Sequence, residues 1–143
     1  MGLFTALFGP KVQAQPPARK EIVVLMGVAK FEFEVLGGAQ QQATLEAICG
    51  PRKQMGVNRF ETARLVLEQK NPLDKNAVRV EIRGKPVGYL CHEHAILCRQ
   101  QLIARGKPHA DAQCQATIRG GWISSDGRKG DYEVWLDLPS WQP

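Results

Sequence analysis

The chain has 143 residues, a length that suits one domain with a short extension. Hydrophobic residues make up 43% of it and charged residues 23%, which is an ordinary globular balance able to fill one core. The net charge of +5 is compatible with nucleic acid as a partner and equally with a plain soluble protein. Because no apolar run approaches the roughly 20 residues needed to cross a bilayer, the sequence excludes a membrane-spanning helix.

The first 29 residues are predicted to form an apolar arm and a linker, and residues 30–143 the main domain. One helical face near the start would carry Leu3, Phe4, Leu7 and Phe8. Residues 11–20 are rich in Gln, Ala and Pro, which is typical of an extended linker. The apolar run in residues 22–26 predicts either a first strand or an arm packed on the domain. The start lacks the positive region of a secretory signal, so we expect an intracellular, cytoplasmic protein with reduced cysteines.

The main domain begins with a predicted strand and a short helix. Alternation over residues 31–35 predicts a strand with Phe31, Phe33 and Val35 inward. Apolar spacing over residues 40–49 then predicts a helix that Gly50 ends. Residues 52–59 form a basic loop, which is normally a solvated surface but would contact phosphates beside a binding groove.

Two central strands are predicted over residues 61–69 and 77–82, followed by a tight turn and a third strand that ends at Leu90. Leu65, Leu67 and Gln69 would share one face of the first strand. Gly84 would supply the positive φ of the tight turn. The connection in residues 71–76 contains Pro, Asp and Asn residues that restrict or bond their own backbone, so we expect a rigid loop suited to binding.

A helix and two further strands complete the predicted domain. The helix covers residues 92–105, and its expected buried stripe consists of Ala95, Ile96, Leu102 and Ile103. Alternation predicts strands over residues 112–118 and 132–138. Between them, Trp122 follows two glycines and precedes a polar, glycine-rich loop. The pattern as a whole indicates a mainly β fold.

The stretch Asn71-Pro72-x-Asp74-x-Asn76-Ala77-Val78-x-Val80, followed by Gly84 and by Val87-Gly88-Tyr89-Leu90, resembles the HIRAN domain family. The similarity covers roughly residues 31–138. It implies a small OB-like β-barrel of about six strands with two short helices. It also implies binding of single-stranded DNA and capture of a free 3′ end, in which Asp74 would accept a hydrogen bond from the terminal hydroxyl. Gln41 and Leu73 stand where relatives carry stacking aromatics.

The expected nucleic-acid site combines basic residues for phosphates with aromatic residues for bases. Tyr89 and Trp122 are the stacking candidates, although each would equally pack on the rim or end of a barrel. Asp74 would alternatively only cap its own loop. The complete set of predicted site residues is Gln41, Arg52, Lys53, Lys70, Asn71, Leu73, Asp74, Lys75, Arg79, Tyr89, His92 and Trp122.

Catalytic and metal-binding interpretations have less support in the sequence, and no cofactor is expected. Weak zinc candidates are Cys91, His94, Cys98 and Cys114, but the usual paired spacing is missing and cysteines are common in cores. No phosphate-binding loop or nucleophile elbow is present, so we expect no enzyme activity. The carboxylates Glu68, Asp74 and Glu81 leave a magnesium-dependent nuclease open as an alternative.

The basic residues and the resemblance together predict a DNA-binding module. The resemblance implies that it takes single strands or 3′ ends and assists DNA repair or replication machinery. A helicase or nuclease on another chain is the expected protein partner. The first alternative is a protein-interaction module whose partner docks on the N-terminal apolar arm, and the second is the metal-dependent nuclease.

Overall fold

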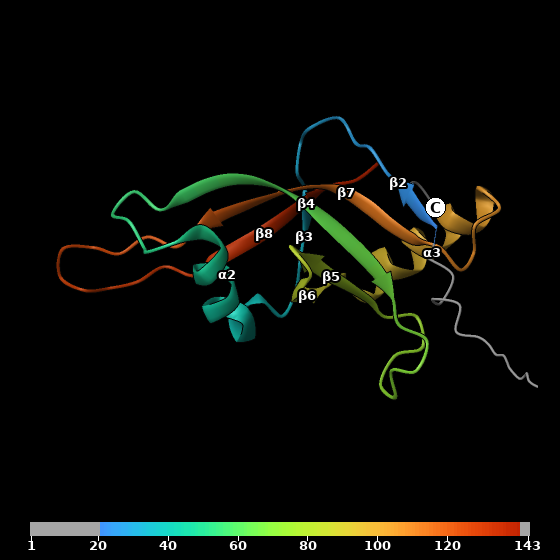
Figure 1. Cartoon of the computed structure of the whole chain (residues 1–143), viewed down its shortest axis with the longest axis horizontal. Coiled ribbons are helices and arrows are strands. Elements are labelled where there is room, and N and C mark those ends of the chain that lie inside the picture. The colour runs from blue at the N-terminus through green and yellow to red at the C-terminus, as the bar shows by residue number, and fades with distance from the viewer. Residues whose placement is uncertain (1–20, 141–143) are drawn as a thin grey trace, which may run out of the picture.

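The computed structural model describes residues 21–140, which form one curled sheet with two short α-helices (Figure 1). The predicted apolar face at residues 3–8 and the linker at residues 11–20 lie outside these residues. The strands are β2 (Ile22–Val24), β3 (Phe33–Glu34), β4 (Val57–Leu67), β5 (Val78–Ile82), β6 (Lys85–Tyr89), β7 (Asp111–Gly120) and β8 (Tyr132–Asp137). The helices are the 3-10 helix η2 (Gly38–Gln41), α2 (Gln42–Cys49) and α3 (His92–Ala104). This mainly β, OB-like half-barrel confirms the predicted fold class.

The sheet runs in the order β3-β8-β7-β4-β5-β6, with antiparallel neighbours throughout this path. Its two ends meet where the Leu36 N–H donates to the Tyr89 carbonyl at 2.8 Å and the Tyr89 N–H donates to the Leu36 carbonyl at 2.9 Å. These two bonds close the curl, because they join the segment after β3 to the last strand of the path.

Gly88 makes that closure possible. Its φ is 148°, and a Cβ built on it would lie 2.2 Å from the Leu36 carbonyl oxygen and 2.6 Å from Val35 Cγ1. Only a residue without a side chain lets the two backbones approach this closely. The close neighbour of Gly88 in the structure is therefore the Leu36 backbone.

Strand β4 is the longest and pairs with both β5 and β7. Ala63, Leu65 and Leu67 face the core, and the alternate residues face outward, as the period of two predicts. Gln69 was expected on the buried face, but it lies beyond the end of the strand and is exposed. The basic loop was also predicted too long, because β4 already begins at Val57.

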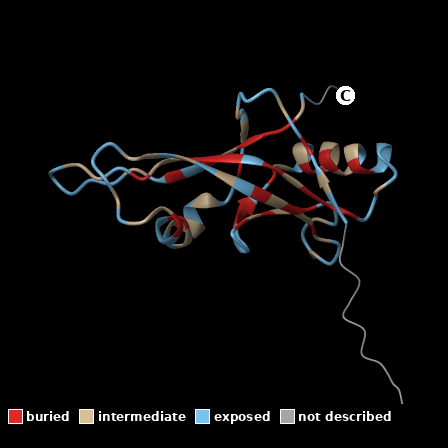
Figure 2. Cartoon of the chain, turned by 45° about the horizontal axis from the view of Figure 1, so that its top comes forward, coloured by how far each residue is buried: buried red, intermediate tan, exposed pale blue. Residues whose placement is uncertain are grey.

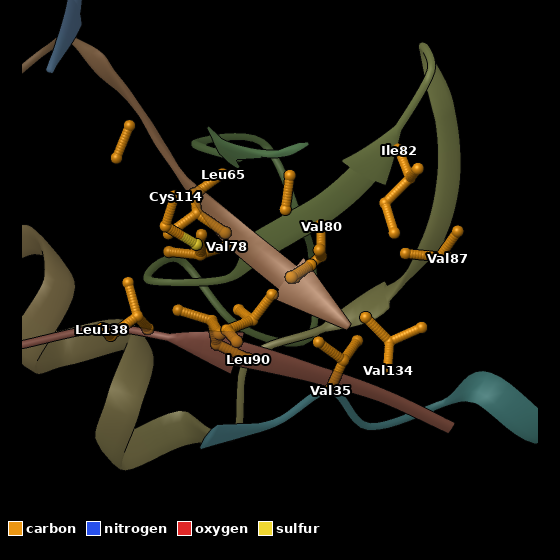
Figure 3. Close-up of a cluster of buried hydrophobic side chains, with 14 of the residues drawn as sticks. Val35, Leu65, Val78, Val80, Ile82, Val87, Leu90, Cys114, Val134 and Leu138 are labelled. Carbon is orange, nitrogen blue, oxygen red and sulfur yellow. The ribbon is translucent and has the colours of Figure 1, made fainter. Parts of the chain in front are cut away.

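The hydrophobic core fills the inside of the curl, and Figure 3 shows side chains from opposite strands turned toward one another. Buried positions run along the centre of the sheet, whereas the connecting loops are exposed (Figure 2). Helix α3 contributes Ala95, Cys98 and Leu102, which lie three and four residues apart on one face. Ile103 was wrongly assigned to this buried stripe and is 61% exposed.

The first strand of the predicted domain is shorter than expected. Only Phe33 and Glu34 pair with β8, because Phe31 has a φ of 51° and cannot continue an extended strand. Phe31 consequently does not point inward; its ring packs edge-on against Phe60 on the outer side of β4, with centroids 5.6 Å apart.

Residues 22–24 form a strand, the first of the two alternatives that the sequence left open. β2 pairs in parallel with the beginning of β7, and Leu25 is buried in the core. The sheet therefore begins before residue 30, the expected start of the main domain. Among residues 21–140, no helix has the length and apolar character needed to span a membrane.

Candidate nucleic-acid interface

The loop between β4 and β5 is held in one conformation by its own side chains. Asn71 Oδ1 accepts hydrogen bonds from the backbone N–H groups of Leu73 at 2.9 Å and Asp74 at 3.2 Å. Asp74 Oδ1 accepts one from the Asn76 N–H at 2.8 Å. Side-chain oxygens that bond nearby backbone in this way replace the bonds of regular structure, so the predicted rigidity of the loop has a physical basis.

Arg99 of helix α3 fastens the base of the same loop. Its guanidinium donates to the backbone carbonyls of Glu68, Asn76 and Ala77 at 3.0 to 3.1 Å. These bonds satisfy carbonyls on both sides of the loop, where the β4–β5 ladder has ended. The helix therefore holds the two strand ends together at the place where the loop leaves the barrel.

An open groove of about 660 Å³ lies beside this loop. Four of the predicted site residues border it. The groove is lined by Val66, Leu67, Glu68, Gln69, Lys70, Asn71, Pro72, Leu73 and Arg79. Leu73 is 95% exposed and leaves an apolar side chain at the mouth of the groove.

Glu68 is the centre of the polar contacts on the groove wall. Its carboxylate accepts hydrogen bonds from Asn71 Nδ2 at 3.0 Å, from the Tyr89 hydroxyl at 3.0 Å and from the Arg79 guanidinium. Partial burial acts to raise the pKa of Glu68, but these three hydrogen bonds outweigh it and hold the pKa below the ordinary glutamate value. Glu68 therefore stays ionised and ties the loop, β5 and β6 together.

Arg79 is already occupied by carboxylates. One edge of its guanidinium donates to Glu68, and its Nε donates to Glu81 at 2.9 Å. A phosphate would have to compete with both carboxylates for this charge. The groove therefore offers phosphates mainly Lys70, which lines it, and the exposed Lys75 on the loop.

Asp74 and His92 form a pair next to the groove, with His92 Nδ1 3.1 Å from Asp74 Oδ2. The backbone hydrogen bond from Asn76, followed by the contact with His92, lowers the pKa of Asp74 below the usual aspartate value. The structure thus brings Asp74, His92 and Tyr89 close to the four residues that border the groove. Asp74 caps its loop as the alternative interpretation required, and its carboxylate also remains partly exposed.

Three other predicted site residues lie at the opposite end of β4, where Val57 pairs with Gly120 (Figure 1). The Arg52 guanidinium donates to the Gly130 carbonyl at 2.6 Å, pairs with Glu46 and stacks over the ring of Tyr132. Its side chain is only 9% exposed, so Arg52 mainly fastens α2 to the β7–β8 connection.

Lys53 and Trp122 are neighbours at this same end, joined by a parallel bridge. The Trp122 indole packs directly against Gly130 of the β7–β8 connection, where an added Cβ would lie 2.0 Å from Nε1, and Trp122 remains 39% exposed. Gln41 lies on η2 beside the closure at Leu36, away from both clusters. The structure thus divides the predicted set between two regions and leaves Gln41 in neither.

The metal and nuclease candidates are dispersed. Cys98 and Cys114 lie in the core, where burial raises the pKa of each thiol to about 12 and keeps it protonated. Within the described part of the chain, no three His, Cys, Asp or Glu side chains are arranged to hold a metal ion. Glu68 and Glu81 both pair with Arg79.

The sequence analysis missed two residues of this region. Glu68 was considered only as a nuclease carboxylate, and Arg99 was not considered at all. Glu68 lies directly after β4 and Arg99 lies on α3. Their roles depend mainly on partners more than ten residues away, such as Arg79 for Glu68 and the Ala77 carbonyl for Arg99, so the local sequence gave no signal. Searches of protein families, of curated proteins and of solved structures found nothing that matches this chain.

Proposed function

We propose that this protein is a HIRAN-like module that binds single-stranded DNA, and 3′ ends in particular, in the groove beside residues 71–76. The observation that carries the proposal is a groove on an OB-like sheet, bordered by a rigid polar loop and by Lys70, Asn71 and Arg79. Barrels of this type bind single strands by combining a basic groove with surfaces on which bases stack.

The rigid loop supports this proposal energetically. A binding loop that is already ordered loses little conformational entropy when a ligand binds, so weak contacts suffice for measurable affinity. Arg99 and Asn71 supply that order before any ligand arrives. Because Arg79 is neutralised by two carboxylates, affinity would come mainly from Lys70, Lys75 and contacts to the sugar and base.

Selection of the 3′ end would depend on Asp74. A carboxylate repels a phosphate and accepts a hydrogen bond from a hydroxyl, so it favours a free terminal hydroxyl over a phosphorylated end. Each carboxylate oxygen of Asp74 has one neighbour, Asn76 or His92, and can accept a further bond. Stacking would be reduced because Leu73 and Gln41 replace aromatic residues.

Fluorescence anisotropy with labelled oligonucleotides tests the proposal. We expect wild-type protein to prefer a 3′-hydroxyl strand over the same strand with a 3′-phosphate, over blunt duplex and over RNA. Asp74→Asn keeps a side chain that can bond Asn76 and removes the charge, so it should abolish discrimination between the two ends. The matched control is Asp126→Asn, since Asp126 is also a loop carboxylate held by its neighbours but lies far from the groove.

Salt titration adds a second measurement to the same experiment. Affinity should fall as salt rises, because phosphate contacts release counterions. No detectable binding to any of the four nucleic acids, or equal binding to both ends by the wild type, would refute the proposal.

A protein-interaction module is the second candidate, and one observation favours it. Alternate residues of β2 and the segment after it expose apolar side chains, which form the β2 stripe: Ile22, Val24, Met26 and Val28. Met26 and Val28 are each 76% exposed, which is unusual for a row of apolar residues on a monomer. Loss of a co-purifying partner on Val24→Lys and Met26→Lys, with oligonucleotide binding absent from the wild type, would favour this function instead.

A further inference from the structure

The groove continues onto the outer face of strand β4. Ala63, Leu65 and Leu67 are buried, so the alternate residues Phe60, Thr62, Arg64, Val66 and Glu68 lie along the opposite face. Val66 and Glu68 are also part of the groove wall. We call the outer face of β4 from Phe60 to Glu68 the β4 track. At about 3.3 Å per residue, the six steps from Phe60 to Val66 span about 20 Å.

Arg64 stands in the middle of the β4 track, and its side chain has no hydrogen bond or ion pair to any other residue that the structure describes. Its Nε is buried and has no hydrogen bond, and Arg64 forms no ion pair with any residue between 21 and 140. Glu81 lies opposite it in the β4–β5 ladder, but that carboxylate is bound to Arg79. Arg64 is therefore a cation on this face that can bind a phosphate without breaking an ion pair within residues 21–140.

An exposed aromatic side chain marks the far end of the β4 track. Phe60 is 64% exposed in the middle of a strand, and the ring of Phe31 supports it edge-on at 5.6 Å with an interplanar angle of 62°. Across the sheet, Phe60 is followed by Thr117 and then by Trp135, over which the Arg119 guanidinium lies at 5.5 Å. Exposed rings beside cations are surfaces on which bases stack.

The segment that carries Phe31 is held against the outer face at some cost. Ala29 and Phe31 have φ values of 64° and 51°, which side chains other than glycine rarely adopt. The Ala29 N–H donates to Asp137 Oδ1 at 2.9 Å, and Gly27 packs so closely on β8 that a Cβ there would lie 2.5 Å from the Leu138 carbonyl oxygen. These contacts hold in place the segment whose Phe31 ring packs edge-on against Phe60.

From these observations we propose that a single strand leaving the groove follows the β4 track, places a phosphate on Arg64 and stacks a base on Phe60. The inference rests on the proposed function and extends it to a longer footprint, with the 3′ end in the groove and the 5′ side toward Phe60. It also supplies a stacking surface in place of the two expected ones, since Leu73 in the loop and Gln41 on η2 are not aromatic. Nucleic acid fits this face better than an apolar protein surface does, because Arg64 would be left unpaired beneath the latter.

The test measures affinity as a function of oligonucleotide length. Labelled oligothymidylates of about 3, 6, 9 and 12 nucleotides, within the range of single OB-fold sites, are titrated in low salt. Wild-type affinity should rise with length and then level off. Phe60→Leu keeps an apolar contact with Phe31 and should lower affinity for the 12-mer about fivefold to a hundredfold, as loss of one stacked base predicts. The 3-mer should bind equally to both proteins.

Arg64→Gln tests the phosphate contact separately. It should lower 12-mer affinity, reduce the dependence of log affinity on log salt by about one unit, and leave 3-mer binding unchanged. Arg105→Gln is the matched control, because it removes the same charge from the far end of α3, where Arg105 contacts the Val24 carbonyl. Thermal melting checks that each variant is folded.

The outcomes separate this inference from the function on which it rests. If the wild type binds the 3-mer as tightly as the 12-mer, or if Phe60→Leu and Arg64→Gln leave 12-mer binding intact, the β4 track is refuted while the groove stands. If the wild type binds no oligonucleotide, both proposals fail. Sedimentation measures the oligomeric state of each variant. If Phe60→Leu changes the oligomeric state and leaves oligonucleotide affinity unchanged, the exposed ring is a contact between copies of this chain and the inference is overturned.

Discussion

Replacing Gly88 by alanine is the sharpest test of how the barrel is closed. The substitution adds one methyl group at the point where β6 meets the segment after β3. Gly84→Ala is the matched control, since Gly84 also has a positive φ, of 76°, but no atom lies within 4 Å of the added Cβ. The pair therefore separates backbone strain, which both variants suffer, from the close contact that only Gly88 makes.

The expected magnitudes follow from the geometry. Gly84→Ala should lower the free energy of unfolding through backbone strain alone, by about 1–2 kcal/mol for a side chain in the left-handed region. At Gly88 the added Cβ lies 2.2 Å from the Leu36 carbonyl oxygen, well inside van der Waals contact, so the two backbones must separate. Overpacking of about 1–3 kcal/mol adds to strain of about 1–3 kcal/mol, which gives about 2–6 kcal/mol in total.

Urea denaturation followed by tryptophan fluorescence measures both variants. A domain of this size has an unfolding free energy of about 5–15 kcal/mol, so Gly88→Ala should lower the midpoint severely and Gly84→Ala only moderately. Gly88→Ala should also weaken oligonucleotide binding, because Tyr89 follows it directly and contacts Glu68 on the groove wall. Equal loss of stability in the two variants would show that the Leu36–Tyr89 contact does not hold the barrel closed.

Three further predictions concern ionisation, reactivity and turnover. The hydrogen bonds to Glu68 hold its pKa in the folded protein below the pKa in the unfolded chain. Ionised Glu68 therefore stabilises the fold above the unfolded pKa, and this stabilisation is lost as the pH falls through the folded pKa. Glu68→Gln removes the ionisation, so the urea midpoint should fall less between neutral and acid pH than it does in the wild type. Cys98 and Cys114 should resist iodoacetamide at pH 8 in native protein and react after denaturation, as peptide mass spectrometry would reveal. Purified protein should hydrolyse neither ATP nor DNA with magnesium or manganese, and turnover abolished by Glu81→Gln would contradict this.

The strands were predictable wherever one face is buried and the other is not. The alternation in β5 and the second half of β4 fixes which residues face the core, and Gly84 marks the turn after β5. The signal failed where tertiary contacts override local pattern. Phe31 alternates correctly with Phe33, yet the contact of Ala29 with Asp137, 108 residues away, draws the chain across the outer face instead.

The sequence predicted the rigid loop of the candidate site, but it did not predict which arginines of the site form ion pairs. Asn and Asp side chains commonly bond backbone N–H groups a few residues ahead, so the hydrogen bonds of Asn71 and Asp74 could be predicted from the sequence alone. The state of an arginine depends on partners that the fold selects. The sequence analysis counted Arg52 and Arg79 as cations for phosphate, but both are paired in the structure. Arg64 was not considered, and it has no ion pair within residues 21–140.

The distribution of paired and unpaired arginines determines how the protein would select its ligand. Because Glu68 and Glu81 offset Arg79, the attraction of the groove for phosphate would come from Lys70 and the nearby Lys75, and a strand held there would be selected through its hydroxyl end and its bases. Counterion release would come from Lys70 and from Arg64 farther along β4. A short oligonucleotide would therefore bind with weak salt dependence and strong preference for its end, whereas a longer one would add salt dependence without changing that preference. Measuring both quantities on the same pair of oligonucleotides separates end recognition from backbone attraction. A salt dependence of the shortest oligonucleotide that persists when Lys70 and Lys75 are both changed to Gln would show that Arg79 is released from its carboxylates on binding.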